Sequence, residues 1–177
     1  MARITPIEYQ EAAPDARVEW DRQVDAHGRM TNMKRTLARS PEALRIYMEW
    51  YALRDRVREF LGERITLLFA HAISSENDCL ICSTYFRRDL IESGGTPEDL
   101  PLSEREQAFV RFGRAIARDP NRVPDDLFRE IESHLEADRI VTLTAFAGLM
   151  VATNIVNNVL QVDLDDYLAK YRERSGP

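Results

Sequence analysis

The sequence predicts an all-α protein, and three observations support this fold class. Apolar residues recur at spacings of three and four along most of the chain, which is the period of an amphipathic helix. No stretch alternates between apolar and polar residues for long enough to form a strand. Helix-capping signals stand before several of the periodic segments. With 177 residues, the chain is expected to form one domain that buries a core without disulfide bonds.

Three helices are predicted in the first half of the chain. The first begins at Pro41 with Ser40 as its N-cap. Its apolar face consists of Leu44, Tyr47, Met48, Tyr51 and Val57. The apolar face of the second consists of Ile65, Leu68, Phe69 and Ala72. The third extends from Cys79 to Ser93 and is ended by Gly94 and Gly95.

The second half continues in the same way. Ser103 and Glu106 form a capping box that opens a helix, which stops near Asp119 and Pro120. A short helix is predicted over residues 124–134 and a long apolar one over 137–160. A last amphipathic segment begins at Asp163 or Asp165.

The charge of the chain argues against two classes of partner. It has 24 Lys and Arg against 30 Asp and Glu, a formal net charge of −6. Neither nucleic acid nor an anionic membrane is therefore an expected partner. The first eight residues lack the apolar region of a secretory signal. Because this export signal is lacking, we expect a cytoplasmic protein. In a reducing cytosol, a close cysteine pair is rarely a permanent disulfide.

The longest apolar stretch, residues 140–156, contains three threonines, a glycine and an asparagine. It is too short and too polar to span a bilayer comfortably. A helix that is apolar around most of its circumference is instead buried, either in the core or in a subunit interface. We therefore expect a homo-oligomer in which this helix or the N-terminal arm contributes to the interface.

Cys79 and Cys82 are the only cysteines, and they are three residues apart. On a helix, this spacing places both on one face, close enough to form a disulfide. Asn77 or Asp78 is the predicted N-cap, which puts Cys79 in the first turn. Unpaired N–H groups and the helix dipole there favour a thiolate, whereas the negative charges of Asp78 and Glu76 oppose it. The pair points to redox chemistry or to half of a metal site.

Other interpretations of the pair are less well supported. Zinc needs four ligands, usually in two closely spaced pairs, and His27, His71 and His134 occur singly. We therefore expect neither a metal nor a cofactor. Two buried, inert thiols that only contribute to packing remain an alternative.

The sequence around the cysteines resembles a known family. Cys79, Leu80, Ile81 and Cys82 stand at a helix start after an apolar helix. With the segments 28–33, 38–41, 102–106 and 154–162, they resemble AhpD-like proteins of the carboxymuconolactone decarboxylase superfamily, specifically their peroxidase-related branch. The resemblance covers roughly residues 28–165. We accordingly divide the chain into an N-terminal arm and first helix (1–27), an AhpD-like helical domain (28–165), and a C-terminal helix and tail (166–177).

The resemblance implies an all-helical, homo-oligomeric protein that reduces hydroperoxides by cycling the cysteines between dithiol and disulfide. The family pattern has a histidine four residues after the second cysteine, where this chain has Phe86. The family's catalytic glutamate falls on Leu67, and Glu63 and Glu76 are the nearest carboxylates. The usual proton relay is therefore missing or displaced.

The candidate catalytic residues are accordingly Cys79, Cys82, Glu76 and Tyr85, with Glu76 as a base and Tyr85 as a hydrogen-bond donor. We expect an antioxidant thiol oxidoreductase, an alkylhydroperoxidase or disulfide reductase. Its partners would be a small hydroperoxide or disulfide substrate and a thiol reductant protein. A redox-sensing or interaction protein with little turnover is one alternative, and a decarboxylase-like enzyme that does not use the thiols is another.

Overall fold

The computed structural model describes residues 2–172, which form nine α-helices and two short 3₁₀-helices with no strand among them. The predicted all-α fold is confirmed. The helices are α1 (Pro14–His27), α2 (Asn32–Leu37), α3 (Pro41–Trp50), α4 (Ala52–Leu61), α5 (Glu63–Glu76), α6 (Leu80–Glu92), α7 (Glu104–Arg118), α8 (Asp125–Glu132) and α9 (Ala137–Leu160). The 3₁₀-helices are η1 (Tyr9–Glu11) and η2 (Asp166–Tyr171).

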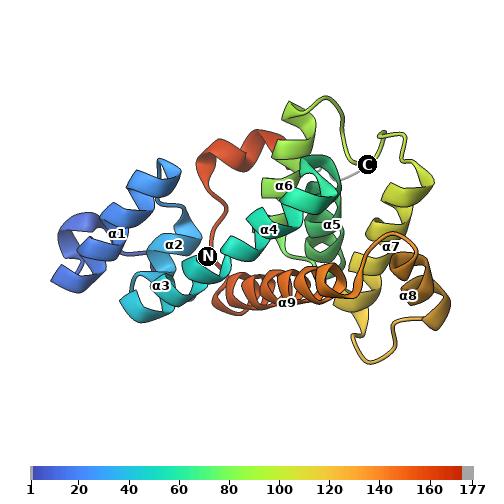
Figure 1. The fold of residues 1–177 in the computed structure, drawn as a ribbon. Coiled ribbons are helices and arrows are strands. Elements are labelled where there is room, and N and C mark those ends of the chain that lie inside the picture. The colour runs from blue at the N-terminus through green and yellow to red at the C-terminus, as the bar shows by residue number, and fades with distance from the viewer. Residues whose placement is uncertain (1, 173–177) are drawn as a thin grey trace.

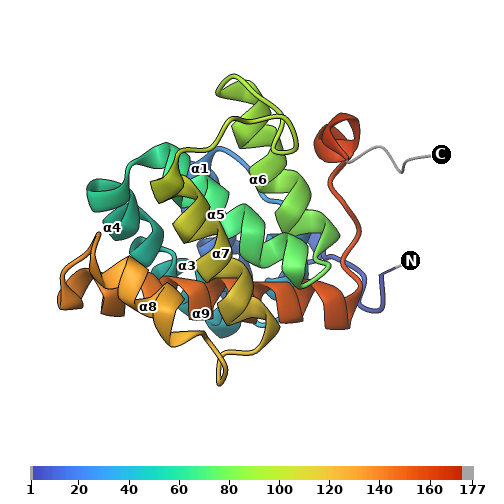
Figure 2. The same cartoon turned by 90° about the vertical axis from the view of Figure 1, so that its right-hand side faces the viewer.

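The long helix α9 organises the molecule. It crosses beneath the group formed by α4, α5, α6 and α7 (Figures 1 and 2). Helices α1 to α3 gather near one of its ends, and α7 and α8 lie near the other (Figure 1). The segment that carries η2 leaves the C-terminal end of α9 and packs against α6. The site described below lies where α2, α6, α9 and η2 meet.

Three phenylalanines pack together at the centre of the core. Phe69 on α5 packs against Phe112 on α7 and Phe146 on α9, with ring centroids 6.3 Å apart in both pairs. Helix α7 can approach α5 closely because residue 113 is glycine: a Cβ there would lie 3.1 Å from the carbonyl oxygen of Phe69. These contacts hold α5 rigidly and therefore fix the place where it ends, just before the cysteines.

Helix α9 is long and apolar enough to cross a membrane, judged by length and composition alone. Half of its most apolar window is buried inside the protein, including Leu143, Phe146 and Leu149, which are fully buried. A core helix satisfies the same criterion, and α9 is the core helix of this fold.

Several helix ends were predicted correctly. The Ser40 side chain accepts a hydrogen bond from the N–H of Ala43, and Ser103 and Glu106 form the predicted capping box. One expectation was wrong: the face from Leu44 to Val57 belongs to two helices. The chain bends at Tyr51, whose N–H bonds to the carbonyls of both Tyr47 and Met48, tightening the last turn of α3. No glycine or proline marks this bend, and the side chain of Tyr51 reaches from it to Thr153 on α9.

Both predicted domain boundaries fall at the ends of helices. Helix α1 ends at His27 and η2 begins at Asp166, although η2 is a 3₁₀-helix. The predicted C-terminal tail from 173 onward lies outside the described residues. The N-terminal arm packs on its own chain: the N–H and guanidinium of Arg3 bond to the carbonyls of Leu160 and Val159. The division itself stays a prediction.

Candidate active site

A short turn between α5 and α6 positions the two cysteines. Asn77 caps the end of α5, and Asp78 adopts the left-handed conformation with φ of 50°, which aspartate tolerates better than most residues. The N–H of Cys79 bonds to the Ser74 carbonyl at 2.9 Å. Cys79, rather than the predicted Asn77 or Asp78, is therefore the N-cap of α6, and Cys82 is in its first turn. The expected placement of the pair at a helix start is confirmed.

The two cysteine side chains lie 3.3 Å apart, and both are free thiols. This separation suits a hydrogen bond between the sulfurs, and a disulfide requires only a further small approach. Both residues are buried, but unequally: Cys82 is 6% exposed and Cys79 is completely enclosed.

The pKa values of the two thiols are shifted in opposite directions. A hydrogen bond from the Cys82 thiol lowers the pKa of Cys79 against the effect of burial, with help from the backbone N–H groups of Cys82 and Ile81. That same hydrogen bond, together with burial and the Cys79 charge, raises the pKa of Cys82. Of the two thiols, Cys79 is therefore the one that loses its proton first, and Cys82 is the one that keeps it.

Asn157 on α9 supplies a polar contact to both sulfurs. Its Nδ2 donates to Cys82 Sγ at 3.2 Å and lies 3.9 Å from Cys79 Sγ and 3.6 Å from Met33 Sδ. This donor lowers the pKa of both thiols. The neighbouring Asn158 donates from Nδ2 to the Asn77 carbonyl at 2.8 Å, which attaches the cysteine turn to α9.

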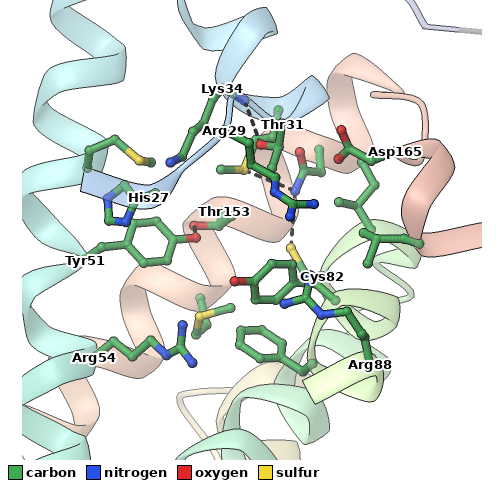
Figure 3. A pocket seen from close by; sticks show the side chains of 18 of the residues that line it. His27, Arg29, Thr31, Lys34, Tyr51, Arg54, Cys82, Arg88, Thr153 and Asp165 are labelled. Atoms are coloured by element: carbon green, nitrogen blue, oxygen red, sulfur yellow. Dashed lines mark hydrogen bonds between the residues drawn. The ribbon is translucent and has the colours of Figure 1, made fainter. Parts of the chain in front are cut away.

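Cys82 opens into a pocket of about 1290 Å³, whereas Cys79 does not line it (Figure 3). The pocket is lined by residues from α1, the α1–α2 connection, α2, α3, α4, α6, α9 and η2. Its lining combines charged side chains, among them Arg29, Lys34, Arg54 and Arg88, with aromatic and thioether ones: Met33, Met48, Tyr51, Tyr85, Phe86, Met150, Tyr167 and Tyr171. A pocket of this size and composition suits an organic molecule.

Tyr51 contributes a buried phenol beside Cys82. Its hydroxyl lies 3.3 Å from Thr153 Oγ1, which itself donates to the Leu149 carbonyl at 2.8 Å. Tyr51 is therefore the donor to Thr153. Burial and the nearby Cys82 raise the pKa of Tyr51, so the phenol stays protonated at any physiological pH.

Tyr85, predicted as a site residue, lines the same pocket. The guanidinium of Arg88 lies 4.3 Å above its ring and 5.6 Å from that of Tyr167, and Arg29 covers Tyr167 at 4.5 Å. These stacked contacts join α6, η2 and the α1–α2 connection at the pocket mouth.

Glu76, the predicted base, is not brought to the pocket. Its carboxylate pairs with Arg118 of α7 at 2.8 Å, and Glu76 does not line the pocket. Glu63 pairs with Arg54 at 3.2 Å, and His71 lies outside the pocket, where burial lowers its pKa to about 4. Phe86 lines the pocket at the position of the family histidine. Within residues 2–172, no group of three or more His, Cys, Asp or Glu side chains could hold a metal ion.

Sequence reasoning missed Tyr51, Asn157 and Lys34, which also belong to the pocket. Tyr51 was assigned to an ordinary apolar face and Asn157 to the end of the long helix. A buried asparagine within an otherwise apolar helix was the available signal, since buried polar groups need a reason.

No protein-family model matches the sequence, and no curated protein is similar to it in sequence. Solved structures are similar in fold. The debrominase Bmp8 without ligand has 15% identity and a TM-score of 0.78 over 95% of each chain. A cysteine-to-alanine variant of Bmp8 in complex with 2,3,4-tribromopyrrole has 14% identity and a TM-score of 0.79, over 95% of this chain and 94% of that one.

A third structure is described as an alkylhydroperoxidase AhpD core, an uncharacterized peroxidase-related protein from Ralstonia eutropha JMP134. It has 16% identity and a TM-score of 0.71 over 94% of each chain. The chain has the AhpD-like fold. The similarity in fold extends over 94–95% of the chain. It therefore reaches beyond residues 28–165, the range of the resemblance in sequence. The fold expected from the family resemblance is confirmed.

Proposed function

We propose that this protein is a cytoplasmic thiol oxidoreductase that reduces a small organic substrate with Cys82 and Cys79. The observation that carries the proposal is the thiol pair itself, 3.3 Å apart with only Cys82 open to the pocket. Cys82 would attack and Cys79 would resolve. A thiol reductant protein would then reduce the disulfide.

With a hydroperoxide, the chemistry balances without a histidine. The proton of Cys82 passes to the Cys79 thiolate, and Cys82 Sγ attacks a peroxide oxygen. An S–O bond forms, the O–O bond breaks, and the leaving alkoxide takes a proton from water to become the alcohol. Cys79 then attacks the sulfenic acid, an S–S bond forms, and hydroxide leaves as water with the Cys79 proton. Cys79 thus supplies the base that the displaced Glu76 does not.

Reductive debromination of an aromatic ring is a second candidate. The pair supplies two electrons and one proton, so it can replace a bromine with hydrogen, release bromide, and end as a disulfide. The aromatic and thioether lining of the pocket favours this substrate over a small peroxide. The fold similarity to the debrominase Bmp8 supports it too.

The experiment supplies the reduced protein with cumene hydroperoxide or 2,3,4-tribromopyrrole in the presence of dithiothreitol. Mass spectrometry follows the products and the Cys79–Cys82 disulfide. Turnover with disulfide formation supports the proposal and identifies the substrate type. Disulfide formation without turnover would favour a redox sensor. Turnover of neither substrate, with both thiols unchanged, would contradict thiol chemistry at this site.

Replacing Phe86 with histidine should accelerate peroxide consumption. Phe86 is one helical turn after Cys82 and lines the pocket, so a histidine there can exchange protons with peroxide oxygens. A positioned acid–base group contributes about 10²–10⁴-fold, and we expect at least a tenfold gain in kcat/KM. Phe86→Leu controls for the lost aromatic ring. An equal gain in both variants would show that access, rather than proton transfer, limits the rate.

We propose that the protein assembles as a homo-oligomer through the outer face of α9. Val141, Ile155 and Val159 are 55–69% exposed along this face, and a Cβ at Gly148 would meet no atom within 4 Å. Another helix could approach this face closely. Ile155→Asp should therefore lower the mass seen by sedimentation, whereas Val18→Asp on α1 should not. A monomeric wild-type protein at micromolar concentration would contradict the proposal.

A further inference from the structure

Lys34 on α2 is a buried cation at the pocket wall. The residue is 9% exposed, and its side chain is one of those that line the pocket. The chain contains two lysines, Lys34 and Lys170, among its 24 cationic residues. A buried ammonium normally has a counter-ion, since desolvating a charge is costly. Within the described residues, the Lys34 ammonium has no hydrogen bond or ion pair.

None of the described carboxylates of the pocket pairs with Lys34, although Asp165 has a buried Oδ2 that lacks a hydrogen-bond partner. Glu49 pairs with Arg45, Asp55 with Arg58, Glu92 with Tyr171 and Arg88, and Asp165 accepts from the Asn32 N–H near Arg29 and Arg35. His27, the titratable neighbour on α1, is neutralised rather than charged, because burial and Lys34 lower its pKa. Nothing facing Lys34 from α1, α3, α4 or the η2 segment therefore balances its charge.

Burial alone lowers the pKa of Lys34, to about 8. The amine is thus mostly protonated at neutral pH, although no carboxylate among the described residues pairs with it. Figure 3 shows Lys34 entering the cavity from α2, on the side of Tyr51 and His27, while Cys82 enters from α6. Lys34 and Cys82 therefore line the same cavity from different walls.

We propose that the pocket binds an apolar organic acid, whose anionic group pairs with the Lys34 ammonium while its reducible bond lies against Cys82. The aromatic and thioether lining accommodates the apolar body between these ends. The exposed Arg29 at the mouth, stacked on Tyr167, adds positive potential along the entry path. The anion site rests on Lys34 alone, and the position of the reducible bond rests on the proposed function.

The direct test measures benzoate and benzamide binding calorimetrically at pH 7. A hydrogen bond to a charged group corresponds to about 10–100-fold in affinity, so benzoate should bind at least tenfold more tightly. Lys34→Met should remove this preference, and Lys34→Arg should keep part of it. Arg129→Met, which removes an exposed cation on α8 outside the pocket, is the control and should leave the preference unchanged. The preference should fall as pH rises through about 8, where Lys34 loses its proton. Equal or undetectable binding of both probes, or the same loss in Arg129→Met, would contradict the anion site.

Thermal stability shows whether Lys34→Met is correctly folded. Because the pKa of Lys34 lies below its ordinary 10.5 in the folded state, the unfolded chain binds more protons between about pH 8 and 10.5. Wild-type stability should therefore rise with pH in this interval, relative to the variant. Lys34→Met should melt at a higher temperature at pH 7, and the difference should narrow toward pH 10.5.

Turnover separates the two proposals. With linoleic acid hydroperoxide, Lys34→Met should raise KM by at least about tenfold, whereas the methyl ester should be reduced equally by both proteins. Binding of benzoate through Lys34 without any turnover would retain the anion site and reject the thiol reductase. If Lys34→Met leaves the KM for the acid unchanged, the anion site would be rejected and the thiol reductase retained.

Discussion

Cys82→Ser should abolish substrate reduction, whereas Cys79→Ser should permit one turnover and then stop. Only Cys82 lines the pocket, so it alone can reach the substrate, while the enclosed Cys79 can reach only Cys82. Without Cys79, the oxidised Cys82 has no resolving partner at 3.3 Å. Rapid-quench product analysis of the reduced proteins should show no product for Cys82→Ser and one equivalent for Cys79→Ser.

After that single turnover, Cys82 should be in a specific oxidation state. With a hydroperoxide, dimedone should trap a sulfenic acid on Cys82 in Cys79→Ser, and mass spectrometry should find the added mass on that residue. The wild-type protein should give an intramolecular disulfide and little trapped product. Multiple turnovers by both variants would show that the thiols are bystanders and that the reaction occurs elsewhere.

Asn157→Leu should slow substrate reduction by about 10–100-fold at neutral pH, because a hydrogen bond to a charged group contributes about 1.5–3 kcal/mol. Asn157 Nδ2 donates to Cys82 Sγ at 3.2 Å and lowers the pKa of both thiols. Its loss should raise both pKa values and move the rising limb of the rate profile to higher pH. Steady-state rates between pH 6 and 10 measure this shift.

Two further variants control for this effect. Asn158→Leu loses a hydrogen bond to the Asn77 carbonyl rather than to sulfur, so its pH profile should stay near that of the wild type. Asn157→Asp should be slower than Asn157→Leu above the pKa of the new carboxylate, since its charge opposes a thiolate. A rate profile for Asn157→Leu that keeps the wild-type midpoint would mean that Asn157 only fills space. Its buried Oδ1 has no partner, so Asn157→Leu should cost little stability.

The sequence by itself determined the parts of this protein that depend on neighbours along the chain. Capping by Ser40 and by Ser103 with Glu106 is a local interaction, so the starts of α3 and α7 could be predicted from residue types three positions apart. The three-residue spacing of Cys79 and Cys82 likewise ensured that a helix start would place both on one side. These features required no knowledge of distant contacts.

Only the tertiary structure decided which side chains surround the two thiols. Glu76 lies three residues from Cys79, yet its carboxylate pairs with Arg118 of α7, which packs against α5, and does not reach the pocket. Asn157 and Lys34 are far from the cysteines in sequence and reach the site because α9 and α2 meet α6 there. Burial then sets the pKa of Lys34 and Tyr51, and it depends on the whole surrounding shell. A long-range contact or a desolvation cost belongs to the packed fold and has no signature in a local window of sequence.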